Sequence, residues 1–391
     1  MARRWTLARD LMAREGLDAM LLFGNSGVNR HNQANVFWLS NHLDLHHAYL
    51  LAPHDVRIDA ALYVGLTNHV PQARRAADIP IVQWGEYDPA RTVAARLREI
   101  GLVRGRIGLV GVNHTFGIGM PFQHHALLAE MLPGLTLVDV TKAFVALRAV
   151  KSDEEIARLR RAAALTDRAI DALRHEVRPG LPEYALPGII EGAYRREGGD
   201  PHIAFVRSMP MDDPNGCVPA QDPSDRTIRR GDVVITEISA TLWGYSGQIH
   251  RPIFVGTDPT SAWRRMFETA AEAFHRMAKA MRPGARESDI VAAASLIGER
   301  GYAVYDDLVH GYGVDIHPPV IDRSCVVHWD RGTLPSPGGQ RFERNMAVVI
   351  QPNPITPDER MGLQVGALTV VTDGGAASLH QIPLEPVIAE A

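Results

Sequence analysis

Polar side chains on two neighbouring predicted strands are the first candidates for chemistry in this sequence. Glu237 lies in a run of β-branched and apolar residues, and Gln248 and His250 lie in a second such run after a predicted turn at 243–245. Because side chains alternate across a strand, Gln248 and His250 share one face of theirs. A hairpin with polar groups on one face predicts the wall of a site. The alternative is an exposed edge hairpin whose polar face meets water.

Two histidines in a glycine-rich segment form the second group. His310 and His317 lie seven residues apart in the segment 310–317, HGYGVDIH, which also contains Tyr312. Glycines let the backbone pass close to a ligand, and imidazoles act as acid, base or hydrogen-bond donor near neutral pH. The segment therefore predicts a reactive loop. The alternative is a pair of structural histidines.

Cys217 is a candidate nucleophile. It lies in the segment 212–230, which is rich in Pro, Asp, Gly and Ser and is predicted to be a loop. The alternative is that Cys217 acts as a small, buried apolar residue.

The hairpin, the histidine segment and a third stretch together resemble one known family. The hairpin 231–254, the segment 310–318 and the stretch 345–352 are similar to motifs of the pita-bread family, which includes methionine aminopeptidase, prolidase, aminopeptidase P and creatinase. The segment 35–40, which is predicted to be a strand, weakly resembles a motif of that family's N-terminal domain. The resemblance implies an α/β N-terminal domain, an α+β pita-bread (creatinase/aminopeptidase) C-terminal domain and a homodimer.

The resemblance also implies where metal ligands would stand. Metal-binding members carry two aspartates, one histidine and two glutamates, and the corresponding positions here are Glu237, Gln248, His310, Gln351 and Gly366. Only one carboxylate and one imidazole remain, whereas divalent ions in such sites need several anionic oxygens. We therefore predict no catalytic metal and no cofactor.

Creatinase is a metal-free precedent within the family, so the resemblance leads us to predict a metal-independent, creatinase-like hydrolase. Its substrate would be a small amino-acid-like compound, cleaved at an amidine or amide C–N bond other than an ordinary peptide bond. Creatinase's own residues are absent near Ala220 and at His250, so we do not expect its substrate here. The predicted catalytic residues are Glu237, His250, His310, His317 and Cys217. The predicted substrate-binding residues are Gln248, Gln351, Arg251, Tyr312 and, in the N-terminal domain, Arg30 and His31.

Three alternative functions stay open. The polar set suits proton abstraction next to a carbonyl, as in a lyase or decarboxylase. An ordinary Xaa-Pro peptidase would require metal. A non-catalytic binding protein would also have lost metal ligands, although it would have no need of several imidazoles.

Length, charge and cysteine content limit the number of domains, the partners and the cellular compartment that we expect. The chain has 391 residues, a net charge of −4 and two cysteines. These values predict two or three domains, no nucleic-acid partner and a reducing compartment. With no apolar stretch of signal-peptide or membrane-spanning length, we expect a cytoplasmic protein that takes a small-molecule substrate.

The elements that must position these residues fall into two predicted domains, 1–148 and 149–391. Strands and helices alternate at short spacing in the first, which predicts an α/β domain. In the second, Ser152 followed by Glu155 predicts a capping box that opens a helix. Further helices are predicted at 183–196, 260–281 and 288–301, and strands at 201–209, 233–238 and 249–255.

Overall fold

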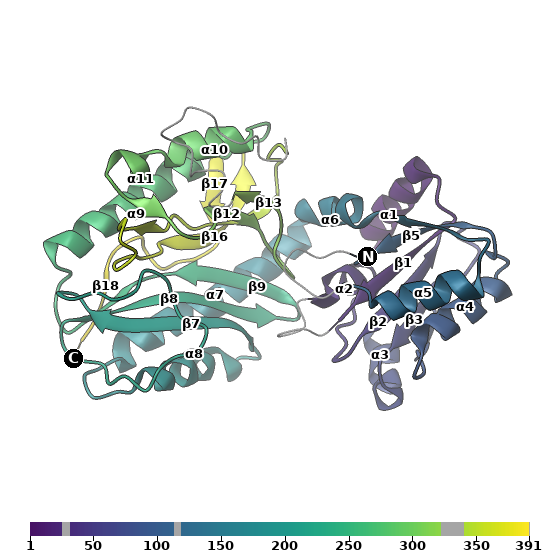
Figure 1. Cartoon of the computed structure of the whole chain (residues 1–391), viewed down its shortest axis with the longest axis horizontal. Coiled ribbons are helices and arrows are strands. Elements are labelled where there is room, and N and C mark those ends of the chain that lie inside the picture. The colour runs from purple at the N-terminus through teal and green to yellow at the C-terminus, as the bar shows by residue number, and fades with distance from the viewer. Residues whose placement is uncertain (26–31, 113–118, 322–339, 391) are drawn as a thin grey trace. The chain divides into compact units, whose positions relative to one another are not determined.

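The computed structural model describes residues 1–25, 32–112, 119–321 and 340–390. The chain forms two compact units, Met1–Arg148 and Ala149–Ala391 (Figure 1). Arg30 and His31, predicted to bind substrate, lie outside the described residues. Among the helices that are described, none is both long and apolar enough to cross a membrane.

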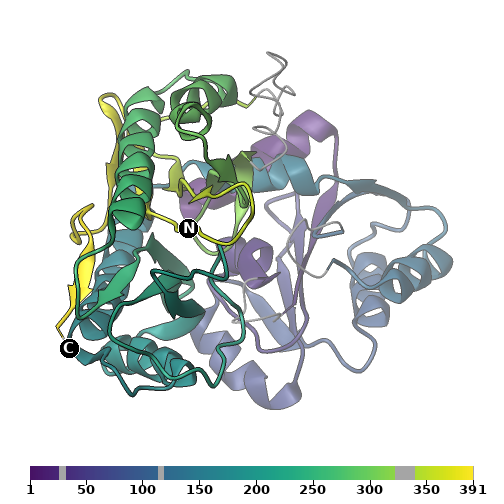
Figure 2. The same cartoon turned by 60° about the vertical axis from the view of Figure 1, so that its left-hand side comes forward.

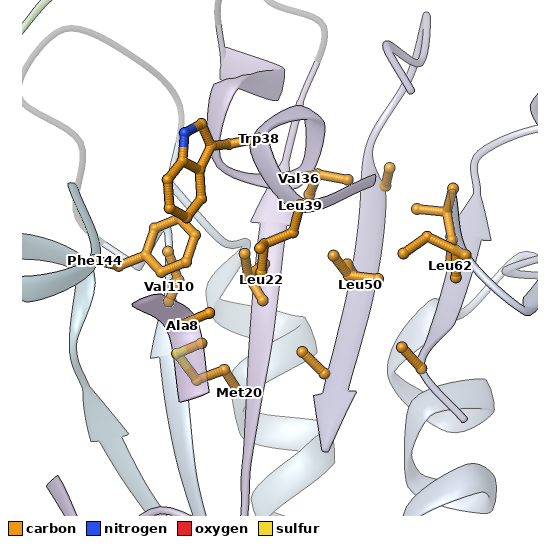
Figure 3. Packing of buried hydrophobic residues seen from close by; sticks show 14 of the residues in the cluster. Ala8, Met20, Leu22, Val36, Trp38, Leu39, Leu50, Leu62, Val110 and Phe144 are labelled. Atoms are coloured by element: carbon orange, nitrogen blue, oxygen red, sulfur yellow. The ribbon is translucent and has the colours of Figure 1, made fainter. Parts of the chain in front are cut away.

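The N-terminal unit is built on a six-stranded mixed sheet in the order β4-β3-β2-β1-β5-β6. Its strands are β1 (Ala19–Gly24), β2 (Ala48–Pro53), β3 (Ala61–Val64), β4 (Ile81–Trp84), β5 (Arg106–Val110) and β6 (Thr136–Asp139). Its helices are α1 (Ala2–Glu15), α2 (Ala34–Ser40), α3 (Val70–Ala76), α4 (Pro89–Glu99), α5 (Phe122–Met131) and α6 (Thr141–Ala149). β1 is buried along its whole length because helices cover both faces of the sheet. On one face, Trp38 of α2 meets Phe144 of α6 edge to face at 5.4 Å above Leu22 (Figure 3).

The prediction of a strand at 35–40 is wrong, because these residues belong to helix α2. All of α2 is buried, and a short apolar run does not distinguish a buried helix from a buried strand by periodicity. Asn35 within it accepts a hydrogen bond from Arg148 at 2.7 Å. This contact ties α2 to the end of α6.

The C-terminal unit is built on a large curved sheet whose main path runs β13-β12-β14-β16-β9-β8-β10-β18, with β7 beside β8 and β17 beside β16 (Figures 1 and 2). The strands are β7 (Asp200–Pro210), β8 (Asp232–Leu242), β9 (Tyr245–His250), β10 (Ile253–Val255), β11 (Ala303–Val304), β12 (Val309–Gly311), β13 (His317–Ile321), β14 (Ala347–Ile350), β15 (Pro354–Ile355), β16 (Gly366–Thr372), β17 (Gly375–Ser378) and β18 (Val387–Ala389). The helices are α7 (Asp153–Glu176), α8 (Leu186–Arg195), α9 (Ser261–Ala280), α10 (Glu287–Ala294) and α11 (Leu296–Glu299). Helices α7 and α8 pack on the β7–β9 side of the sheet, and α9 and α10 pack on the β12–β16 side.

Helix α7 begins as predicted and sets the position of the hairpin. Ser152 and Glu155 exchange the two hydrogen bonds of a capping box, at 3.2 Å and 2.9 Å. A Cβ atom at Gly247 would lie 2.4 Å from the backbone nitrogen of Ala163, so glycine alone allows α7 to lie this close to β9. Thr166 then donates a hydrogen bond to the Gly247 carbonyl at 2.7 Å.

The second hairpin strand is shorter than the predicted 249–255. It divides into β9 and β10 at Arg251 and Pro252. Proline has no backbone N–H to donate to a neighbouring strand, so the pairing stops there.

A buried carboxylate outside the hairpin gives the first testable prediction. Glu183 accepts hydrogen bonds from the backbone N–H and hydroxyl groups of both Ser208 and Ser224. Burial alone would raise the pKa of Glu183, but these hydrogen bonds outweigh it and hold the pKa below its ordinary value. We expect Glu183→Gln to lower the free energy of unfolding by about 1–3 kcal/mol at neutral pH, because donors lose a charged acceptor. Urea denaturation of both proteins measures this, and an unchanged midpoint would contradict it.

Candidate functional site

The hairpin and three further strands of the C-terminal unit bring the predicted residues together. Strands β12, β14, β16, β9 and β8 are consecutive neighbours in the sheet. The site positions are His310 on β12, Gln351 directly after β14, Gly366 at the start of β16, Gln248 and His250 on β9, and Glu237 in the middle of β8. Pairing places Ser239 of β8 opposite Gln248, and Gly366 opposite His250.

A continuous chain of hydrogen bonds connects four of these positions through one additional acid. The Gln248 amide donates to Glu237 Oε1 at 2.8 Å, and its Oε1 lies 3.1 Å from His310 Nε2. His310 Nδ1 lies 2.7 Å from Asp307 Oδ2, and the Gln351 amide donates to the other oxygen of that carboxyl group. The prediction that Glu237, Gln248, His310 and Gln351 share one site is therefore consistent with the geometry.

Sequence reasoning missed two acids of this cluster, Asp306 and Asp307. The Asp307 backbone N–H donates to Asp306 Oδ1 at 2.8 Å, and the Gln364 amide lies 3.3 Å from Asp306 Oδ2. Asn353 fixes the turn by accepting from the Asp306 N–H at 2.9 Å. The available signal was a pair of adjacent acids directly before the apolar residues that lead into His310. We call Glu237, Asp306, Asp307, Gln248, His250, His310 and Gln351 the acid–amide cluster.

The acid–amide cluster has two layers of different accessibility. Its three carboxyl side chains keep part of their surface accessible, whereas Gln248, His250, His310 and Gln351 are buried. A ligand can therefore reach the acids. The buried amides and imidazoles hold the acids in position through hydrogen bonds.

Burial and neighbouring charges give Glu237 and Asp306 different pKa values. Burial, with the neighbouring charges of Asp306 and Asp307, raises the pKa of Glu237 to about 8. Burial, with the charge of Asp307, raises the pKa of Asp306 to about 6. At neutral pH Glu237 is thus a carboxylic acid and Asp306 is mostly a carboxylate. At neutral pH, Glu237 can therefore donate a proton and Asp306 can accept one.

His250 fills space that a side chain at position 366 would need. A Cβ atom on Gly366 would lie 2.6 Å from His250 Nδ1. Burial, with the charges of His310, Arg251 and His380, lowers the pKa of His250 well below its ordinary value, so the ring is neutral. His250 packs against the backbone of β16 within the cluster.

Tyr312 lies beneath the cluster rather than in an accessible substrate-binding position. Its hydroxyl group lies 3.0 Å from Ser239 Oγ and 2.7 Å from His202 Nδ1. Burial raises the pKa of Tyr312. His202, which sequence reasoning did not identify, thus joins β7 to β8 and to the loop after β12.

Two predicted residues, His317 and Cys217, have described contacts elsewhere. His317 lies 2.9 Å from Lys151 Nζ, and its Nδ1 lies 2.7 Å from the Pro318 carbonyl. Cys217 is buried against Gly362. Among the hydrogen bonds described, none joins either residue to the acid–amide cluster.

Arg251 differs from the predicted substrate-binding role in a similar way. Its guanidinium donates to four backbone carbonyls, those of His250, Gly366, Ile382 and Pro383. Arg251 is almost fully buried and holds the C-terminal segment against β9 and β16. These contacts give Arg251 a structural role.

Family models match both units of the chain. The model described as "Creatinase/Prolidase N-terminal domain" matches residues 4–150. The model described as "Metallopeptidase family M24" matches residues 157–373, more than half of the 391 residues. The chain belongs to metallopeptidase family M24. The predicted pita-bread family and fold are thereby confirmed, and the chain is a member of a hydrolase family.

Individual M24 relatives agree over most of the chain. It is 31% identical over 290 residues to "Probable dipeptidase PepE" of Mycobacterium tuberculosis, covering 74% of this chain and 73% of the relative. It is 26% identical over 355 residues to the Xaa-Pro dipeptidase of Pyrococcus furiosus, covering 90% and 92%. The solved Xaa-Pro dipeptidase from Bacillus anthracis has a TM-score of 0.80 at 21% identity and covers 99% of both chains, which supports the fold.

These names contradict the prediction of a metal-independent, creatinase-like hydrolase of non-peptide C–N bonds. The relatives described above are named as a dipeptidase and as Xaa-Pro dipeptidases. They favour the peptidase alternative. The prediction gave too much weight to the resemblance to creatinase.

The residues of this chain do not fit the metal centre that the M24 name implies. In the described ranges, no three His, Cys, Asp or Glu side chains are grouped so that they could hold a metal ion. Of the five implied ligand positions, two are neutral amides and one is Gly366. Moreover, Gln248 is engaged at both ends, because its amide nitrogen donates to Glu237 Oε1 at 2.8 Å and its Oε1 lies 3.1 Å from His310 Nε2.

Proposed function

We propose that this chain hydrolyses the peptide bond of short peptides, with Xaa-Pro dipeptides as the substrate class. The observation that carries the proposal is that Glu237 and Asp306, two partly accessible acids of the acid–amide cluster, differ in pKa. The substrate class is supported by the names of the M24 relatives. Peptide hydrolysis needs one group that takes a proton from water and one that gives a proton to the departing amine.

Asp306 and Glu237 suit these two tasks. Asp306, with a pKa of about 6, is ionised at neutral pH and takes the proton from the attacking water. Glu237, with a pKa of about 8, is protonated at neutral pH and gives its proton to the amine nitrogen as the C–N bond breaks. The Gln248 amide, bonded to Glu237 Oε1, fixes the orientation of that carboxyl group. His310 contacts both Gln248 and Asp307 and so fixes the positions of these two side chains relative to each other.

The direct test is release of free proline from Ala-Pro, compared with Ala-Ala and Pro-Ala. Both chelator-treated and Mn²⁺-supplemented protein are assayed, so that metal content does not decide the outcome. We expect Ala-Pro to be the preferred substrate, with kcat/KM rising through pH 6 and falling through pH 8. No release of proline above a heat-inactivated control would contradict the proposal.

We further propose that the protein is a homodimer in the cytoplasm. The dimer is supported by the family resemblance, and the location by the chain's two cysteines. Light scattering of the purified chain tests the first, because a monomer mass would exclude the dimer.

A further inference from the structure

The outer strand of the N-terminal sheet borders a pocket beside helix α4. Strand β4 ends the sheet order, and its pairing with β3 places Ile81 opposite Ala61 and Gln83 opposite Tyr63. Helix α4 buries its apolar side against the inner strands, and Gln83 stays exposed. Residues of β3, β4, α4 and the connection between β4 and α4 line a pocket of about 550 Å³. This volume is in the usual range of small-molecule sites.

Two side chains of opposite charge line this pocket and keep unused hydrogen-bonding groups. Arg91 donates from Nε to Asp88 at 3.1 Å, and its two terminal amino groups have no partner in the part of the chain that the structure describes. The exposed Glu86 carboxylate has no described partner either. The other two charged lining residues pair with each other, since Arg96 Nη1 lies 2.8 Å from Glu99 Oε1. The pocket therefore offers a ligand one positive and one negative group.

The backbone of Glu86 adopts a conformation that suits glycine better than glutamate. Its φ angle is 61°, in the left-handed region, where a side chain crowds the backbone. A glutamate here lowers stability relative to a residue that tolerates this region. Such local costs are frequent at binding sites, so the position is consistent with a role for the carboxylate in binding.

A zwitterion matches these groups better than an ion of one sign. Glu86 repels a ligand that carries only negative charge, and Arg91 repels one that carries only positive charge. A guanidinium group binds a carboxylate through two parallel hydrogen bonds, and a carboxylate accepts strong hydrogen bonds from an ammonium group. Ile81 and Ala95 add apolar surface to the pocket wall. A free amino acid with an apolar side chain provides all three kinds of contact.

We propose that the pocket lined by β4 and α4 binds a free amino acid with an apolar side chain. Arg91 binds the α-carboxylate, Glu86 binds the α-ammonium group, and the side chain packs on Ile81 and Ala95. Every lining residue belongs to the N-terminal unit, so the pocket shares no residue with the acid–amide cluster. The inference therefore does not depend on the proposed function.

The test compares three ligands that share one hydrocarbon side chain, by calorimetry on the full chain. L-leucine carries both charges, 4-methylpentanoate lacks the ammonium group, and 3-methylbutylamine lacks the carboxylate. We expect L-leucine to bind at least about 5-fold more tightly than either analogue, because each analogue loses a charged hydrogen-bonding partner. Equal binding of the three ligands, or no binding of L-leucine, would overturn the proposal.

Two variants of the pocket are each expected to weaken L-leucine binding at least about 5-fold. Arg91→Gln removes the positive charge, and Glu86→Asn removes the negative charge. Asparagine tolerates the left-handed region, so Glu86→Asn should keep or raise the melting temperature. Weaker binding without lost stability separates a binding role from a structural one. A lower melting temperature in Glu86→Asn, or unchanged binding in Arg91→Gln, would contradict the assignment.

Two further variants locate the bound ligand. Arg98→Gln is the matched control for Arg91→Gln, since Arg98 is an exposed arginine of the same helix that donates to the Met131 carbonyl and does not line the pocket. Arg98→Gln should leave L-leucine binding unchanged. Glu237→Gln should also leave it unchanged. Loss of binding in either variant would overturn the proposal, and loss in Glu237→Gln would place the ligand at the acid–amide cluster.

Discussion

The Glu237→Gln variant is expected to hydrolyse Ala-Pro about 10²–10⁴-fold more slowly than the wild type at neutral pH, the usual contribution of a general acid. Glutamine has nearly the same shape as glutamic acid, but it has no proton to give to the departing amine. The alkaline limb of the pH profile, which reports ionisation of Glu237 near pH 8, should vanish with it. Steady-state release of proline from pH 5 to pH 9 measures both effects.

A stability measurement on the same variant separates a chemical defect from a folding defect. The pKa of Glu237 rises from 4.5 to about 8 on folding, so between these values only the folded state holds the proton. Wild-type stability must then fall with rising pH in this window, by at most about 1.4 kcal/mol per pH unit. Glu237→Gln lacks that term and should gain stability relative to the wild type from pH 5 to pH 8. A constant difference would contradict the raised pKa.

The Asp306→Asn variant is expected to lose the opposite limb of the pH profile. Its pKa of about 6 makes Asp306 the base, and wild-type activity should rise through pH 6 as Asp306 ionises. In the variant, activity should be about 10²–10⁴-fold lower and should no longer rise through pH 6. Asparagine preserves an acceptor for the Asp307 N–H. The same proline-release assay reads the result.

Glu183→Gln is the control for both active-site variants. It replaces a buried carboxylate whose described partners, Ser208 and Ser224, lie outside the acid–amide cluster. It should destabilise the protein and leave kcat/KM with Ala-Pro unchanged. If Asp306→Asn kept full activity with an intact acid limb, Asp306 would not be the base.

The sequence was sufficient to place the strands and the loop that carry the site residues. The hairpin with Glu237 and Gln248, and the glycine-rich segment after His310, have patterns that persist when the ligand types change, so the residues could be placed by register. The capping box at Ser152 was equally local, since cap and partner lie three residues apart. Such features depend on neighbours in the chain or on paired strands.

What the sequence did not reveal depends on contacts between distant segments. Asp306 precedes its strand by only a few residues, but its importance arises from Gln364 and Glu237, which other strands bring to it. The burial of Arg251 among carbonyls is likewise a property of the folded C-terminal segment. The segment 35–40 was mistaken for a strand because a fully buried helix has no polar face to reveal its period.

The most direct measurement is a ¹³C NMR titration of protein labelled at the glutamate side-chain carboxyl carbons. The Glu237 signal is assigned by its absence from the Glu237→Gln variant. A neutral acid held in place by Gln248, beside the charges of Asp306 and Asp307, should titrate with a midpoint near pH 8. A midpoint near 4.5, the ordinary value for glutamic acid, would show that Glu237 is an ordinary carboxylate and would contradict the account of this site.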